Sequence, residues 1–191
     1  MNVMGLIGIL NFGGQYNHLI RRRLIELGYN ASFIDPEASL SEVKSRYDCI
    51  IVSGGPWNIP GDLPKMGKAP EYVLEFPGPI LGICLGHQLI AYAYGGSLTG
   101  ETPEFGGFKV TVLDEDTILR GMPRVFTAWE SHNVSVNAAP ANFRVIAVGE
   151  KARVQAMVSS DNRVFGVQFH PEVKHTERGE LVLRNFASLC V

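Results

Sequence analysis

The sequence predicts an α/β domain with a mostly parallel central sheet flanked by helices. Short apolar runs at 5–10, 49–52 and 79–83 have the length of buried strands, and each leads into a segment containing glycine. Continuous apolar strands are typical of a parallel sheet whose two faces are both covered. Helical segments between these strands would supply that cover.

Two segments that follow these strands have the spacing of helices. Ile20, Leu24 and Leu27 recur at helical intervals after the first strand, just before a glycine suited to a helix C-terminus. Leu85 and Leu89 recur in the same way after the third apolar run. Strands that alternate with helices favour parallel pairing, because parallel strands need a crossover connection.

The second half of the chain changes to alternating apolar and polar residues. Alternation indicates strands, and few helical segments separate them, so we expect antiparallel strands added to the sheet. A closing amphipathic helix is expected over 177–189, with one face turned inward. The predicted strands are 108–113, 126–129, 143–148, 152–158 and 163–169, and the inward residues of the helix are Leu181, Val182, Asn185, Phe186 and Leu189.

Length and composition indicate one domain over residues 1–191. The chain is 46% hydrophobic, which suffices for one full core, and it is too short for two domains of ordinary size. A stretch rich in proline and glycine at 56–70 is expected to be an ordered but mobile loop.

The charge and the absence of long apolar runs exclude several classes of partner. A net charge of −2, from 17 basic and 19 acidic residues, gives no field that would attract nucleic acid or an anionic membrane. No apolar run has the length of a membrane span, and the first residues lack the pattern of a signal peptide. We expect a soluble cytoplasmic protein.

The three cysteines, at 49, 84 and 190, argue against a disulfide framework because they are odd in number and widely spaced. We expect Cys49, inside an apolar strand, and Cys190, at the end of the chain, to be structural thiols.

Cys84 has the sequence context of a nucleophile. It stands between Gly82 and Gly86, after a buried strand and before a helix, as a sharp strand-to-helix turn requires. Such a turn raises the sulfur above the sheet, at a helix N-terminus that favours thiolate. A buried structural cysteine is the competing interpretation, but the flanking glycines favour the nucleophile.

His170 is the best candidate for the base among the five histidines. It ends a strand, and Pro171 favours extended geometry, which can bring Glu172 near the imidazole. Cys84, His170 and Glu172 would then be nucleophile, base and orienting group. A surface His-Pro turn with a solvated glutamate is the alternative when these residues are considered alone.

Acyl transfer also needs hydrogen-bond donors for the oxyanion. The glycines of the segment 53–56, Ser-Gly-Gly-Pro, follow a strand and can present amide N–H groups, with the Leu85 amide as a second donor. A phosphate-binding loop and a purely structural turn are the alternatives. Pro56 and Trp57 stand where pyrophosphatase loops continue with an acidic residue and serine.

No metal site is expected from the histidines. They lie at 18, 87, 132, 170 and 175, and their positions and that of Cys84 lack the tight spacing typical of metal ligands.

Three motifs together resemble the class I, triad-type, glutamine amidotransferase family, over nearly the whole chain. They are SGGP at 53–56, GICLGHQ at 82–88 and GVQFHPEV at 166–173. Within the family, the segments 11–16, 130–136 and 170–179 are similar to those of the amidotransferases that serve GMP synthesis. The resemblance implies a flavodoxin-like α/β fold.

The resemblance also implies an activity and a set of roles. Glutamine would be hydrolysed through a thioester on Cys84, with the amides of Gly55 and Leu85 as the oxyanion hole. Gln88, Ser131, His132 and Asn133 would bind the glutamine, whereas no role is assigned to His175 and Thr176.

The implied partner is a separate ATP pyrophosphatase (synthetase) subunit of GMP synthase. No adenylating motif is present in the 191 residues, so ATP, magnesium and xanthosine monophosphate (XMP) would bind that partner, and this chain would carry no cofactor. An amidotransferase that serves chorismate (in anthranilate or aminodeoxychorismate synthase) and a non-catalytic module of the same fold are the alternatives.

Overall fold

Strands and helices alternate through the first half of the chain, as predicted. A computed structural model describes residues 5–190. The first half contains β1 (Leu6–Leu10), α1 (Asn17–Glu26), β2 (Asn30–Ile34), α2 (Leu40–Arg46), β3 (Cys49–Val52), the 3-10 helix η1 (Leu63–Met66), α3 (Ala69–Glu75), β4 (Ile80–Ile83) and α4 (Leu85–Ala93).

The second half contains mostly strands and ends in a helix, also as predicted. Its elements are β5 (Ser97–Thr99), β6 (Glu104–Val112), β7 (Val125–His132), β8 (Ser135–Ala138), β9 (Phe143–Gly149), β10 (Ala156–Ser159), β11 (Val164–Val167) and α5 (Gly179–Ala187).

One large sheet joins the two halves. Its strand order is β2-β1-β3-β4-β11-β10-β9-β6-β7, and β5 pairs with β8 in a small second sheet. The pairings from β2 to β11 are parallel, and those from β11 to β7 are antiparallel. The expected parallel sheet with added antiparallel strands is confirmed, and β11 is the strand where one pattern gives way to the other.

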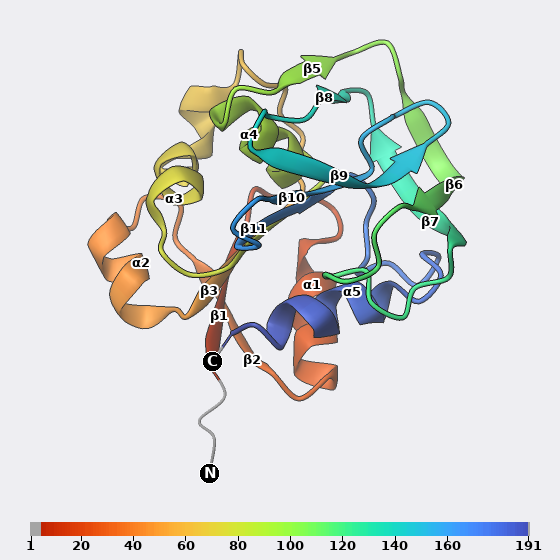
Figure 1. Ribbon diagram of the computed structural model, residues 1–191. Helices are drawn as coiled ribbons and strands as arrows, with labels where there is room; N and C mark the ends of the chain where they lie inside the picture. The colour runs from red at the N-terminus through yellow and green to blue at the C-terminus, as the bar shows by residue number, and fades with distance from the viewer. Residues whose placement is uncertain (1–4, 191) are drawn as a thin grey trace.

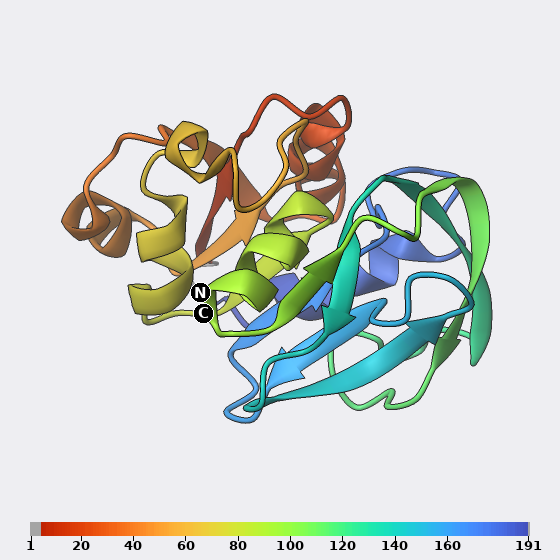
Figure 2. The same ribbon diagram turned by 90° about the horizontal axis from the view of Figure 1, so that it is seen from above.

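Helices cover both faces of the parallel part (Figures 1 and 2). Leu24 of α1 and Phe186 of α5 belong to one buried cluster with side chains from the sheet. Val43 of α2, Val73 of α3 and Leu89 of α4 belong to a second cluster against the opposite face. The apolar strands are buried throughout because both faces are covered. Within residues 5–190, none of the helices combines the length and the apolarity that a membrane span requires.

The closing helix is shorter than predicted. It ends at Ala187, and the Leu189 amide then donates to the Phe186 carbonyl in a tighter turn. That turn rotates Leu189 outward, and the residue is 40% exposed, so its predicted inward position is wrong. Val182 and Phe186 are fully buried, as predicted.

The stretch 56–70 is partly helical and well packed. It contains η1 and the first residues of α3, and Met66 is fully buried within it. The sequence pattern also missed β2 and α2. In β2 the apolar residues are interrupted by Asn30 and Ser32, and the helix α2 is only two turns long, although Ser39 and Glu42 form a capping box at its start.

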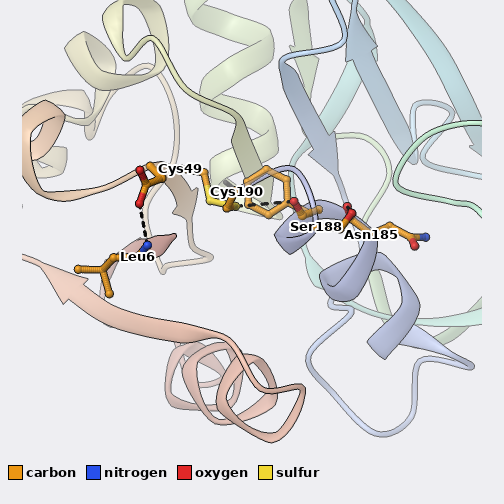
Figure 3. The surroundings of a disulfide bond; sticks show 7 residues. Leu6, Cys49, Asn185, Ser188 and Cys190 are labelled. Carbon is orange, nitrogen blue, oxygen red and sulfur yellow. Dashed lines mark hydrogen bonds between the residues drawn. A yellow bond between two sulfur atoms is a disulfide. The ribbon is translucent and has the colours of Figure 1, made fainter. Parts of the chain in front are cut away.

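Cys49 and Cys190 form a disulfide, contrary to the sequence-based expectation of two structural thiols. Cys49 begins β3, and Cys190 follows α5, with 5.6 Å between their Cα atoms (Figure 3). Their separation of 141 residues hid the pairing, because only the packing of α5 against the sheet brings the end of the chain to β3. The bond ties the last helix to the centre of the sheet.

We expect reduction of this disulfide to destabilise the fold. A crosslink that closes so long a loop restricts the unfolded chain, so its loss should lower the free energy of unfolding by about 3–5 kcal/mol. Denaturant unfolding of the oxidised protein, with and without reductant, measures the difference. Cys190→Ala should unfold like the reduced protein and should not respond to reductant. Equal midpoints for the oxidised and reduced wild type would contradict the prediction.

Candidate active site

Cys84 lies at the turn between β4 and α4, as predicted for a nucleophile. Its backbone has a φ of 52° and a ψ of −104°, which is unusual for a residue with a side chain. Its amide donates to the Val167 carbonyl of β11, and its own carbonyl accepts from the Gln88 amide in α4. The turn therefore holds Cys84 between the sheet edge and the helix N-terminus, where the helix dipole favours thiolate.

The two glycines that flank Cys84 are needed for close packing of the backbone. A Cβ atom on Gly82 would lie 2.5 Å from the backbone of Gly86, and a Cβ atom on Gly86 would overlap the Val52 carbonyl at the end of β3. Their negligible bulk lets α4 start directly above the sheet. This close approach, together with the strained φ of Cys84, explains the Gly-x-Cys-x-Gly pattern.

His170 and Glu172 are joined in a buried pair. His170 Nδ1 lies 2.8 Å from Glu172 Oε1, and the carboxyl group is inaccessible to solvent. Burial alone would lower the pKa of His170, but the charges of Glu172 and of a Cys84 thiolate, and hydrogen bonds to both, raise that pKa well above its ordinary value. The imidazole is thus stabilised as a cation between the two groups.

Backbone and side-chain contacts fix the position of His170. Its amide donates to the Trp129 carbonyl of β7, and its carbonyl accepts a 2.6 Å hydrogen bond from Thr176 Oγ1. The Tyr16 ring packs edge-on against the imidazole, with 4.9 Å between the ring centroids. Thr176 and Tyr16 both lie in segments that resemble the family, but only the fold gives them these contacts.

The Ser-Gly-Gly loop after β3 packs against both reactive side chains. Ser53 Oγ accepts from the Phe12 amide and donates to the Gly54 carbonyl, which also accepts from Asn17 Nδ2. A Cβ atom on Gly54 would lie 3.2 Å from the His170 ring. The loop is therefore held by the β1–α1 connection and needs glycine for its approach to His170.

Gly55 and Leu85 border the same cavity as Cys84, as an oxyanion hole requires. Leu85 is the first residue of α4, so its N–H has no acceptor within the helix. The pair stays a prediction, because no bound substrate defines the direction of the amides.

A cavity of about 380 Å³ opens above Cys84 and is bordered by nearly all of the predicted site residues. Glu172 is not among them, because it lies behind the imidazole. The predicted residues that line the cavity are Gly55, Cys84, Leu85, Gln88, Ser131, His132, Asn133 and His170. The residues that sequence reasoning missed include Gly13, Gly14, Tyr16, Asn58 and Phe105.

The predicted glutamine-binding residues differ in what they leave free. Gln88 Nε2 already donates to the Val134 carbonyl, at 2.6 Å. The Ser131 carbonyl lies 3.9 Å from Cys84 Sγ, so the main chain of this segment faces the nucleophile. The substrate roles of these residues remain predictions.

The His132 side chain is engaged with two buried carboxylates. Its Nε2 atom lies 3.1 Å from Glu104 Oε2 and 3.2 Å from Glu130 Oε2. Burial opposes protonation of His132, but the hydrogen bonds to both glutamates outweigh it and raise its pKa to about 9. Burial likewise raises the pKa of Glu130. Sequence reasoning missed both glutamates, since the pairing of β6 with β7 is not readable from the chain.

Gln168 is a further neighbour of the nucleophile. It follows β11, is fully buried, and places Nε2 3.7 Å from Cys84 Sγ. Its position two residues before His170 on an extended segment is the only sequence signal that could have indicated it.

A family model described as glutamine amidotransferase class-I matches residues 8–189 of the chain. The chain is 54% identical over 185 residues to a protein of Sulfurisphaera tokodaii named as the A subunit of glutamine-hydrolyzing GMP synthase, covering 96% of this chain and 98% of that protein. A protein of the same name from Saccharolobus solfataricus is 49% identical, with the same coverage.

Solved structures agree with these matches. A Thermoplasma acidophilum protein, described as the A subunit of a GMP synthase, superposes with a TM-score of 0.92 at 36% identity, covering 100% of this chain and 96% of that one. A Thermotoga maritima glutamine amidotransferase, at 21% identity and a TM-score of 0.77 over 89% of this chain and 77% of its own, shares the fold. The chain therefore belongs to the class I glutamine amidotransferase family.

Proposed function

We propose that the chain is the glutamine-hydrolysing subunit of a GMP synthase. It hydrolyses glutamine to glutamate and ammonia, and the ammonia passes to a separate ATP pyrophosphatase subunit that converts XMP to GMP. The arrangement of Cys84, His170 and Glu172 at one cavity carries the chemical part of this proposal. The names of the relatives support the acceptor, and their nearly equal length supports a separate partner chain.

In the first half of the reaction, the Cys84 thiolate attacks the side-chain carbonyl carbon of glutamine. The carbonyl oxygen becomes an oxyanion, which the amides of Gly55 and Leu85 would stabilise. His170 gives its proton to the amide nitrogen, the C–N bond breaks, and ammonia leaves behind a thioester. Glu172 keeps the imidazole oriented and stabilises its charge.

In the second half, water hydrolyses the thioester. The neutral His170 accepts a proton from the water as its oxygen attacks the thioester carbon. The same oxyanion donors act again, the C–S bond breaks, and glutamate leaves the restored Cys84 and His170 pair. Ammonia must reach the partner before it is protonated by solvent, so the partner is expected to dock over the cavity mouth.

Replacement of Cys84 should separate the two uses of nitrogen. Cys84→Ser should reduce glutamine-dependent GMP formation by at least about 10³-fold, because the thiol forms the thioester. Ammonia-dependent GMP formation by the same complex should stay within about twofold, since it bypasses this chain. Both rates are measured on the complex with its synthetase. Loss of the ammonia-dependent rate as well would contradict the assignment.

A glutamine analogue that alkylates thiols gives an independent test of the same residue. Mass spectrometry should find the label on Cys84 and not on Cys49 or Cys190, which are joined in a disulfide. Label that persists in Cys84→Ser would identify another nucleophile.

Removal of the Glu172 charge should change the pH profile as well as the rate. The carboxylate raises the pKa of His170, so Glu172→Gln should lower that pKa. The alkaline limb of kcat/KM should then move to lower pH, because the imidazolium and thiolate pair is lost sooner as pH rises. The rate should fall by about 10²–10⁴-fold. Glu180→Gln, an exposed change in α5, is the matched control. An unshifted alkaline limb would argue against the orienting role.

Hydrolysis should respond to the state of the partner, since unregulated hydrolysis wastes glutamine. We expect the glutaminase rate to rise about 5- to 150-fold when the synthetase carries its adenylated XMP intermediate. Glutamate release is measured with the synthetase alone, with XMP, and with XMP plus ATP and magnesium. Equal rates in all three conditions would count against the coupling.

A further inference from the structure

A cluster of three ligating side chains lies beside the active-site cavity, on the inward face of the β6–β7 hairpin. The antiparallel register pairs Glu104 with His132, and Glu130 precedes His132 by two residues on the same face of β7. Phe126 and Ala128, earlier on that face, are apolar and fully buried. The inward face thus changes from apolar to ionisable groups as β7 approaches the cavity.

The three groups converge on one point. One ligand atom from each of Glu104, Glu130 and His132 lies within 4.8 Å of the others, and all three side chains are almost completely buried. His132 also lines the cavity, which gives this cluster a route to solvent. It is distinct from the triad, since neither glutamate contacts His170 or Cys84 by any hydrogen bond among the described residues.

The carboxylate of Glu130 lacks a satisfactory partner. Its Oε2 atom is near His132 Nε2, but the imidazole has hydrogen-bond geometry only toward Glu104. Glu104 accepts further bonds from Gln155 Nε2 and the Ala152 amide, whereas neither oxygen of Glu130 finds a donor within residues 5–190. A fully buried carboxylate without a donor is costly, so a proton or a cation must neutralise it.

The spacing favours a cation. His132 Nε2 lies 3.1 Å from one carboxylate oxygen and 3.2 Å from the other. Neighbouring ligands of an octahedral ion with bonds of about 2.1–2.2 Å are roughly 3.0–3.1 Å apart. One imidazole nitrogen can therefore bind the same ion as both carboxylates, whereas a single N–H can serve only one of them well.

We propose that Glu104, Glu130 and His132 form a binding site for a divalent cation. Two carboxylates and one imidazole, without thiolate, match a first-row ion of the Mn²⁺ or Fe²⁺ type. The histidine spacing predicted no metal site, because two of the three ligands are glutamates brought together by strand pairing. The site belongs to the wall of the cavity and is independent of the proposed glutamine chemistry.

Binding of Mn²⁺ to the whole chain tests this site. Mn²⁺ is chosen because it prefers oxygen and nitrogen ligands, so the Cys84 thiol competes weakly. Titration followed by electron paramagnetic resonance of free Mn²⁺ should give one bound ion per chain for the wild type. Glu130→Gln should weaken binding by at least about tenfold. Cys84→Ser and the exposed control Glu101→Gln should bind like the wild type.

Several results would overturn the site. Wild type that takes up no Mn²⁺ would mean that a proton alone neutralises Glu130. Binding that is unchanged in Glu130→Gln, or lost in Cys84→Ser, would assign the ion elsewhere. If Glu130→Gln does not fold, pulsed resonance of the wild-type complex still decides. Coupling to one imidazole nitrogen is expected in the Cys84-alkylated protein, and its absence would exclude His132 as a ligand.

Discussion

The parallel pairing of β4 with β3 on one side and β11 on the other is the constraint on which the site depends. Val52 pairs with Gly82, and Val167 pairs with Ile83, so three strands end together at one edge of the sheet. Each strand is followed by one part of the machinery: the Ser-Gly-Gly loop, Cys84, and the segment that carries His170. A shift of one residue in either register would turn these groups toward opposite faces.

Burial then gives these groups their electrostatic behaviour. Cys84 is 6% exposed, and His170 and Glu172 are buried as deeply. A lone charge would be expelled from such a place, but two negative groups on either side of one imidazole stabilise its cation. The thiolate and the imidazolium therefore depend on each other, and Glu172 makes the balance favourable. The fold supplies this environment by placing helices on both faces of the sheet.

The sequence reveals those features that depend on local pattern, and it hides those that depend on pairing between distant segments. The buried strands around Cys84, its glycines and the His-Pro-Glu segment were predictable, because each is determined within a few residues. The disulfide of Cys49 with Cys190 was not, and neither was the contact of Glu104 with His132. These contacts follow from the docking of α5 and from the β6–β7 register. Leu189 was misplaced because one tight turn after α5 changes the helical phase.

The polar end of the β6–β7 hairpin has no explanation in stability alone. Apolar side chains of similar volume at Glu104 and Glu130 would continue the buried face that Phe126 and Ala128 begin, without the cost of burying ionisable groups. A fold that retains such groups next to its reaction cavity departs from the pattern of its own core, and such departures are expected at functional sites. The Ser131 carbonyl faces Cys84 from between Glu130 and His132. Whatever neutralises these side chains therefore also fixes the main chain that borders the nucleophile.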